Sequence, residues 1–221
     1  MIGSPGIGKS VFGVFLLLLF MSEHKNVAYR PLHGVNKLHY FTWDANKNCY
    51  KVSLKPVSGH FYEGLFDGNY DGNASYRAGF EHSYLFASPR TDNYNEFVKE
   101  GCVTIYMNPW TAEECHKYVD KVSLDYRIEW LARFNLVGGK PRFLFSNSSL
   151  LEGLIAALRS AIPAFENPKT VIKNVQEGNR FDLLNHILFV LFRDERTPKG
   201  YAIKFASEEI ECLVNAACNT A

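Results

Sequence analysis

The chain has 221 residues, a length that suits one ordinary domain or a core domain with a small appendage. Lys and Arg total 24 and Asp and Glu total 23, so the formal net charge of +1 excludes a protein that binds nucleic acid or membranes mainly through its overall charge. Hydrophobic residues make up 47% of the chain, which predicts a packed core and not a disordered chain.

The motif with the clearest chemistry begins at Gly3, where residues 3–10 read GSPGIGKS and match the phosphate-loop pattern GxxxxGK[ST]. Glycines let the backbone turn with positive φ and approach a polyphosphate closely, so that the N–H groups of the loop converge on its oxygens. Lys9 would reach the β- and γ-phosphates, and Ser10 would place its hydroxyl on a magnesium ion. The predicted cofactor-binding residues are Gly3, Ser4, Pro5, Gly6, Ile7, Gly8, Lys9 and Ser10.

The alternative is a Gly-rich turn that only begins a helix. The match at all four fixed positions, with a long apolar segment directly behind it, favours the phosphate-binding interpretation. A phosphate loop normally follows a buried parallel strand. Only Met1 and Ile2 precede this one, so we expect the first strand to be truncated.

Residues 11–21 read VFGVFLLLLFM and carry no charge. This apolar run is shorter than the roughly 20 residues that span a bilayer. Its only preceding charge is Lys9 and the polar residues 22–25 follow it, so the pattern favours a buried helix over a signal peptide. We expect a helix that is buried on most of its sides in the middle of a layered fold.

Residues 60–66 predict an apolar strand that ends in Asp67-Gly68. In phosphate-loop enzymes an acid at the carboxyl end of a neighbouring strand positions the magnesium ion, which is the role predicted for Asp67. The alternative is an ordinary Asp-Gly turn. No Glu follows Asp67 to act as a base for water, so we expect hydrolysis to be slow or to use another group.

Periodicity and turn residues predict the remaining elements. Thr111 with Glu114 forms a capping box in front of a helix, and Ser207 caps the last helix. The five widely spaced cysteines indicate free thiols, and no metal cluster is evident from the spacing of the scattered histidines. Strands are predicted at 26–29, at 39–43 and 49–54 as a hairpin, at 83–87, 103–107, 186–193 and 201–205; helices are predicted at 92–99, from 111, at 123–137, 148–162 and from 207.

A lone Arg at a helix junction is usually a surface charge. Arg142 follows Gly138, Gly139 and Pro141 directly, so a rigid junction could instead hold its guanidinium against a γ-phosphate. The strand–turn–strand–helix order after residue 186 predicts a small winged-helix-like appendage. We therefore divide the chain into a P-loop NTPase core at 1–137 and a helical lid with this appendage at 138–221.

The order of these pieces resembles the nucleotide-binding domain of Crinkler effectors of oomycetes and fungi, and of the related retrotransposon hot spot proteins of trypanosomatids. The resemblance spans nearly the whole chain, and its specific part is a series of motifs in a fixed order. They are Ser88-Pro89-Arg90 with Tyr94, Phe97 and Lys99; Tyr106 to Thr111 with Glu113-Glu114; Gly138-Gly139-Lys140-Pro141-Arg142; and Phe205-Ala206-Ser207.

The resemblance implies an α/β fold of the AAA/STAND-like P-loop NTPase type, a three-layer sandwich with a parallel sheet and a C-terminal helical or winged lid. It implies ATP and Mg²⁺ as cofactors, with Lys9, Asp67 and Arg142 as catalytic residues and Ser10 and Asp67 as metal ligands. It also implies a secreted effector that acts in a host cell, often in the nucleus, with a host or self protein as partner. No targeting segment in the chain supports that location directly.

Three functions remain open from the sequence. The chain is an ATPase in which hydrolysis resets a switch, a module in which bound nucleotide orders the lid without turnover, or a degenerate fragment that binds nothing. The absence of a Glu beside Asp67 favours the second, whereas Lys9, Ser10 and Arg142 together favour the first. The truncated first strand is the reason for the third.

Overall fold

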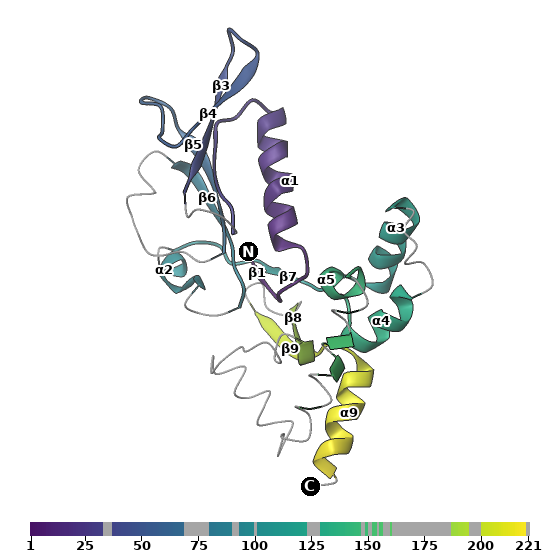
Figure 1. The fold of residues 1–221 in the computed structure, drawn as a ribbon. Coiled ribbons are helices and arrows are strands. Elements are labelled where there is room, and N and C mark those ends of the chain that lie inside the picture. The colour runs from purple at the N-terminus through teal and green to yellow at the C-terminus, as the bar shows by residue number, and fades with distance from the viewer. Residues whose placement is uncertain are drawn as a thin grey trace. The chain divides into compact units, whose positions relative to one another are not determined.

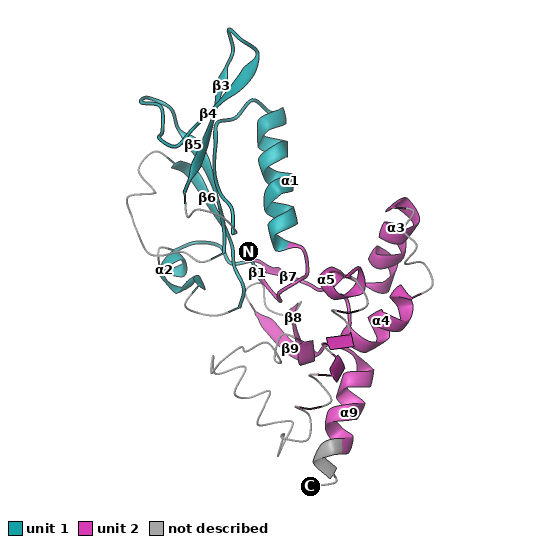
Figure 2. Cartoon of the chain, in the orientation of Figure 1, with its two compact units in different colours: residues 1–2, 9–104 teal, residues 3–8, 105–221 magenta. Residues whose placement is uncertain are grey.

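The computed structural model describes residues 1–32, 37–68, 80–89, 93–99, 101–122, 129–146, 149, 152–153, 155–156, 160, 187–194 and 200–219 (Figure 1). Packing divides the chain into two compact units (Figure 2). Unit 1 contains Met1–Ile2 and Lys9–Thr104, and unit 2 contains Gly3–Gly8 and Ile105–Ala221. The domain boundary predicted between residues 137 and 138 stays a prediction.

Unit 1 is built on a five-stranded mixed sheet in the order β4-β3-β2-β5-β6. The strand β5 pairs in parallel with both β2 and β6, whereas β3 is antiparallel to both β2 and β4. The strands are β2 (Val27–Arg30), β3 (His39–Asp44), β4 (Cys49–Ser53), β5 (Tyr62–Asp67) and β6 (Phe80–Phe86).

The purely parallel sheet that we expected is therefore wrong for this unit. Residues 31–38 join β2 to β3, which is fewer than the dozen or more residues that a parallel crossover needs. Residues 45–48 form the tight turn of the predicted β3–β4 hairpin, which is confirmed. Short connections thus force β3 and β4 to run antiparallel at one edge of the sheet.

Helices pack on both faces of this sheet. The helix α1 (Lys9–Ser22) lies on the face that carries Val27, Leu65 and Phe86 (Figure 1). The opposite face carries a second cluster, to which the short helix α2 (Asn95–Val98) contributes Phe97. Every residue of β5 is buried as a result, including the acidic residues Glu63 and Asp67.

The helix α1 is less buried than the sequence led us to expect. Gly13, Leu17 and Phe20 face the sheet and are buried. On the other side, Val11 is 73% exposed and Leu18 is 60% exposed, and Val14 and Phe15 are exposed as well. One sheet can cover only one side of a helix, so an apolar stripe remains at the surface. In the described part of the chain, no helix combines the length and the hydrophobicity that a membrane span requires.

Unit 2 is mainly helical with a small antiparallel hairpin. The hairpin consists of β8 and β9, which pair from Phe189↔Phe205 to Arg193↔Tyr201 as predicted. The described elements of unit 2 are β7 (Tyr106–Met107), α3 (Ala112–Val122), α4 (Trp130–Val137), α5 (Pro141–Leu144), β8 (Phe189–Arg193), β9 (Tyr201–Phe205) and α9 (Glu208–Asn219). The strand β7 pairs with β1 (Ile2–Gly3) in a separate two-stranded sheet.

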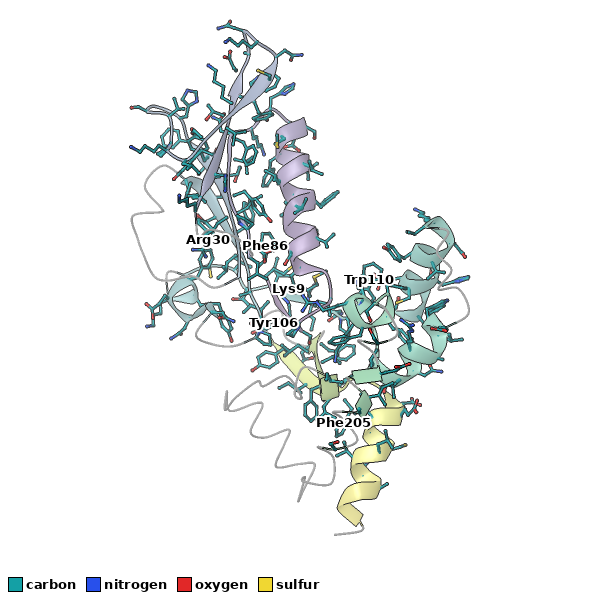
Figure 3. The ribbon with its side chains drawn as sticks, viewed as in Figure 1. Lys9, Arg30, Phe86, Tyr106, Trp110 and Phe205 are labelled. Atoms are coloured by element: carbon teal, nitrogen blue, oxygen red, sulfur yellow. The ribbon has the colours of Figure 1, made fainter. Side chains whose placement is uncertain are left out.

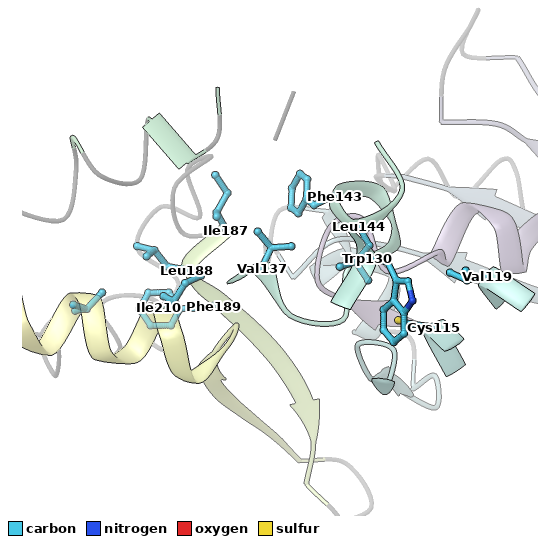
Figure 4. Close-up of a cluster of buried hydrophobic side chains, with 11 residues drawn as sticks. Cys115, Val119, Trp130, Val137, Phe143, Leu144, Ile187, Leu188, Phe189 and Ile210 are labelled. Atoms are coloured by element: carbon cyan, nitrogen blue, oxygen red, sulfur yellow. The ribbon is translucent and has the colours of Figure 1, made fainter. Parts of the chain in front are cut away.

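The core of unit 2 collects side chains from all of its larger elements (Figure 4). Cys115 and Val119 come from α3, and Leu188 and Phe189 come from the segment that enters β8. Both predicted caps are confirmed. The Glu114 amide donates to Thr111 Oγ1 at 3.1 Å while the Thr111 amide donates to Glu114 Oε2 at 2.7 Å, and the Ile210 amide donates to Ser207 Oγ at 3.2 Å.

Some predicted features fall outside the described residues. They include Arg90 of the Ser-Pro-Arg motif, the helix start at Asp92, residues 123–128 of the helix predicted at 123–137, and His186. Most of the helix predicted at 148–162 also lies outside them. The four described cysteines, Cys49, Cys102, Cys115 and Cys212, are free thiols as expected.

Candidate functional site

The segment 3–10 forms a strand–turn–helix connection, which is the local structure that the phosphate-loop motif requires. The turn includes two glycines in the left-handed region, Gly6 with φ of 83° and Gly8 with φ of 103°. Residues with a side chain rarely adopt these angles, so the glycine positions of the motif are explained by the backbone itself. The helix α1 begins directly after the turn, at Lys9.

Two side chains of the loop anchor it within unit 2. Ser4 is buried, and its Oγ accepts a hydrogen bond from the Leu191 amide at 2.8 Å. Ile7 is fully buried, and a Cβ on Gly3 would lie only 2.6 Å from Ile7 Cδ1. Ser4 and Ile7, both predicted to bind the cofactor, therefore direct their side chains into the protein, and any contact with a phosphate has to come from their backbone.

Donors from distant parts of unit 2 hold two successive carbonyl groups of the loop. The Arg142 amide donates to the Gly6 carbonyl at 3.2 Å. The Trp110 indole Nε1–H donates to the Ile7 carbonyl at 3.0 Å. All peptide bonds described are trans, so each N–H points opposite to the carbonyl of the same peptide unit. The N–H groups of Ile7 and Gly8 are thereby turned away from these two donors.

Among the described residues, none accepts a hydrogen bond from the N–H groups of Gly6, Ile7 or Gly8. Three consecutive amide donors thus lack an acceptor in the described part of the chain, and the carbonyls of Gly6 and Ile7 accept hydrogen bonds from other residues. A run of N–H groups of this kind is a candidate anion-binding nest. The first turn of α1 follows the nest in sequence, and a helix N-terminus adds a positive partial charge.

Arg142 lies against the loop although 136 positions separate it from Gly6 in the sequence (142 − 6). A Cβ on Gly6 would be 3.0 Å from Arg142 Cβ and 3.8 Å from Arg142 Nε. The guanidinium group is exposed and forms no hydrogen bond or ion pair with any residue that the structure describes. The guanidinium of Arg142 therefore brings a positive charge next to the loop, and no residue in the described part of the chain pairs with it.

The pair Gly138-Gly139 brings the Arg142 segment and Trp110 together. The Trp110 amide donates to the Gly139 carbonyl at 2.8 Å. A Cβ on Gly139 would lie 1.7 Å from the Trp110 carbonyl oxygen, and one on Gly138 would lie 1.9 Å from the Ala206 carbonyl oxygen. Only glycine permits both contacts, so three motifs that are far apart in the sequence converge here.

In unit 1, Asp67 ends β5, an interior strand of the sheet, on the face that α1 covers. Asp67 follows Leu65 by two positions and therefore shares its face of the sheet, and it is buried with 6% of its surface exposed. Its partner in register is Phe86, which is labelled in Figure 3. Phe12 and Gly13, in the second turn of α1, pack against the same Phe86 ring.

The first turns of α1, which carry Lys9 and Ser10, thus begin at the end of the sheet where Asp67 lies. Met1 and Ile2 extend the sheet at the same end, because Ile2 forms a parallel bridge with Ala87, the residue that follows β6. Burial raises the pKa of Tyr29, and the negative charge of Asp67 raises it further. Tyr29 pairs in register with Leu65 and therefore lies on the same face of the sheet as Asp67.

A cavity in unit 2, with a volume of about 650 Å³, is large enough for a small ligand, and Trp110, Gly138 and Gly139 form part of its lining. Glu208 and Glu209 line it as well, and its described lining contains no basic side chain. Two carboxylates without a cation disfavour a polyphosphate. The loop is thus the better candidate for the binding of phosphate groups.

Sequence reasoning missed the role of Trp110, which had been singled out only as part of a motif. Its position between Pro109 and the capping box of α3 was the available signal. Lys140 is a second residue that was missed: it is fully buried, its Nζ donates to the Ile187 carbonyl at 2.9 Å, and burial lowers its pKa to about 7. Nothing in its sequence context indicated burial.

No group of three or more His, Cys, Asp or Glu side chains suitable for a metal ion occurs among the described residues. A magnesium site formed by Ser10, Asp67 and phosphate oxygens would not need such a group of three side chains. No protein-family model, curated protein or solved structure matches the chain. The resemblance to the Crinkler family therefore stays a prediction.

Proposed function

We propose that the chain is an ATP-binding P-loop NTPase module that works as a nucleotide-driven switch and hydrolyses ATP slowly. The observation that carries the proposal is the loop itself: the amides of Gly6, Ile7 and Gly8 have no acceptor among the residues that the structure describes, and the carbonyls of Gly6 and Ile7 accept hydrogen bonds from Arg142 and Trp110. A backbone nest before a helix N-terminus is the general device by which proteins bind the phosphates of nucleotides.

In this proposal the amides of the loop bind the β-phosphate, and Lys9 bridges the β- and γ-phosphates as a point charge. Ser10 and Asp67 hold Mg²⁺, which neutralises phosphate charge when bound. A hydroxyl and a carboxylate are the hard oxygen ligands that this ion prefers. The packing of α1 and β5 around Phe86 supports this pairing, because it directs both residues to one end of the sheet.

Arg142 is proposed to contact the γ-phosphate and so to distinguish ATP from ADP. Its contact with Gly6 and the lack of a described partner for its guanidinium support this role. A guanidinium can bind two phosphate oxygens at once, which ties the segment around Arg142 to the presence of the γ-phosphate. Gly68 follows Asp67 directly, and the absence of a neighbouring Glu supports slow turnover.

The finer fold belongs to the same proposal: an AAA/STAND-like three-layer sandwich whose C-terminal part is a helical lid with a winged-helix-like appendage. By resemblance to Crinkler effectors, the protein would be secreted and act in a host cell, including the nucleus, with a host or self protein as partner. A non-hydrolysing interaction module is the second candidate function, and the missing Glu beside Asp67 favours it.

Calorimetric titration with ATP, with and without Mg²⁺, tests the proposal. The wild type should bind ATP, and Lys9→Ala should weaken binding by the loss of charge-assisted contacts, each worth about 1.5–3 kcal/mol or about 10- to 150-fold in affinity. Lys47→Ala is the matched control, because Lys47 is exposed in the β3–β4 turn. Equal affinity of Lys9→Ala and the wild type would exclude the phosphate-loop function.

Two further variants separate the roles of the other residues. Asp67→Asn should retain metal-free ATP binding and lose the part of the affinity that depends on Mg²⁺. Arg142→Ala should weaken ATP more than ADP, because ADP has no γ-phosphate for the guanidinium to bind. If Arg142→Ala lowered the affinity for ATP and the affinity for ADP by the same factor, Arg142 would not be a γ-phosphate sensor. Measuring phosphate release by the wild type then decides between slow hydrolysis and a non-hydrolysing module.

A further inference from the structure

Trp110 is the residue that connects the phosphate loop to the Gly139–Arg142 segment. Its indole Nε1–H donates to the Ile7 carbonyl at 3.0 Å, and its backbone amide donates to the Gly139 carbonyl at 2.8 Å. The ring is fixed by edge contacts with Tyr118 and Phe145, at centroid distances of 5.6 and 6.4 Å. A single residue thus holds both segments, the loop through its side chain and Gly139 through its backbone.

The bond from the indole to Ile7 has a direct consequence for the anion nest. The Ile7 carbonyl and the Gly8 N–H belong to one trans peptide unit, so they point in opposite directions. Gly8 has a φ of 103° and no side chain, and without an external partner its peptide could rotate. The indole N–H removes this freedom and keeps the Gly8 N–H pointing away from the indole.

The hydrogen bond to Gly139 ties the position of Trp110 to that of residues 139–142. Gly139 lies so close that a Cβ there would be 1.7 Å from the Trp110 carbonyl oxygen. The capping box at Thr111 and Glu114 fixes the chain immediately after Trp110. A displacement of residues 139–142 must therefore move Trp110 or break its bond to Gly139.

We propose that Trp110 is a positioning residue that sets the anion affinity of the phosphate loop and couples it to the state of the Gly139–Arg142 segment. This inference rests on the proposed nucleotide-binding function. The loop is then a regulated site, because the direction of the Gly8 N–H depends on the hydrogen bond from Trp110, which lies more than one hundred positions away in the sequence. Trp110 does not touch the nucleotide and acts only through the Ile7–Gly8 peptide.

The first test compares Trp110→Phe with the wild type and with Trp43→Phe, a control in unit 1 whose ring stacks on His24. Phe keeps an aromatic ring at position 110 but has no N–H donor. Affinities are measured for Mg-ATP and for pyrophosphate, a probe with no base or sugar. Loss of one orienting hydrogen bond should lower the affinity of Trp110→Phe for both ligands by about five-fold. The affinity of Trp43→Phe for both ligands should equal that of the wild type.

The second test does not depend on whether Trp110→Phe folds. The three tryptophans give three indole N–H signals in an NMR spectrum of ¹⁵N-labelled wild type, and single changes at Trp43 and Trp130 assign the Trp110 signal by elimination. Saturating pyrophosphate should slow the exchange of the Trp110 indole hydrogen with solvent at least several-fold, because a bound anion stabilises the Ile7–Gly8 peptide. The other two signals should not change.

The outcomes separate this inference from the function on which it rests. If the wild type binds ATP and Trp110→Phe binds it equally well, the positioning role is wrong and the nucleotide site stands. An indole signal of Trp110 that does not respond to pyrophosphate in a binding-competent wild type also overturns the role. If the wild type binds neither ligand, both the proposed function and the inference fail.

Discussion

The helix α1 and the segment Gly138–Arg142 show opposite relations between hydrophobicity and burial. The helix α1 contains the most continuous apolar run of the chain, yet Leu18 is 60% exposed. The segment Gly138–Arg142 has no large apolar residue except Pro141, yet Lys140 is fully buried. Burial therefore follows from which backbones approach each other and not from the apolar content of a segment alone.

Gly139→Ala should have the largest effect, because it breaks the close approach on which the second of these segments depends. The added Cβ would lie 1.7 Å from the Trp110 carbonyl oxygen and 2.7 Å from the Trp110 carbonyl carbon. The backbone cannot yield without losing the hydrogen bond between Trp110 and Gly139, so we expect a destabilisation above about 4 kcal/mol. Urea unfolding followed by circular dichroism measures it.

Gly153→Ala is the control for this prediction, since an added Cβ there would meet nothing within 4 Å. In a helical position the change should alter stability by no more than about 1 kcal/mol. Comparable stabilities of Gly139→Ala and Gly153→Ala would show that the close approach is not required.

Leu17→Ala and Leu18→Ala test whether the two sides of α1 contribute differently to stability. Leu17 faces the sheet with 9% of its surface exposed, so its truncation should cost about 2–4 kcal/mol of unfolding free energy. Leu18 is 60% exposed, and its truncation should change stability by less than about 1 kcal/mol. Chemical denaturation of both variants checks the difference. Equal losses would mean that the outer stripe of α1 is covered in solution.

Lys140→Met should have a smaller effect that depends on pH. Burial lowers the pKa of Lys140 from 10.5 to about 7, so above pH 7 the unfolded chain binds more protons at this residue than the folded chain. The free energy of unfolding of the wild type should therefore rise with pH in this range, by at most about 1.4 kcal/mol per pH unit. Met fills a similar volume and does not titrate, so this contribution disappears in the variant.

The measurement compares wild type and Lys140→Met between about pH 7 and 8.5. The upper limit matters because burial raises the pKa of Cys115 from 9.0 to about 11, which makes stability fall with pH above that limit. Taking the difference between the two proteins removes contributions from all other groups. Parallel pH dependences would show that Lys140 keeps its charge in the folded protein.

Local signals in the sequence predicted most of the local structure. Alternating aromatic and β-branched residues around Asp44 predicted the β3–β4 hairpin, and Thr111 and Ser207 predicted the starts of α3 and α9. These features depend on neighbours within a few positions, which the sequence displays directly. The predicted purely parallel sheet was wrong, because strand direction depends on the length of the connections, which the motif-based comparison with P-loop proteins overlooked.

The sequence by itself determined the glycine positions of the turn between Gly3 and Lys9, the strand that ends in Asp67, and the caps of α3 and α9. Tertiary structure alone decided that Trp110 and Arg142 engage the Ile7 and Gly6 carbonyls, because hydrogen bonds between residues more than one hundred positions apart leave no local pattern. It also decided that α1 exposes an apolar stripe and that Lys140 is buried. The residue type indicates which side chains are suited to burial, whereas the packing of distant segments determines which side chains are buried in the folded protein.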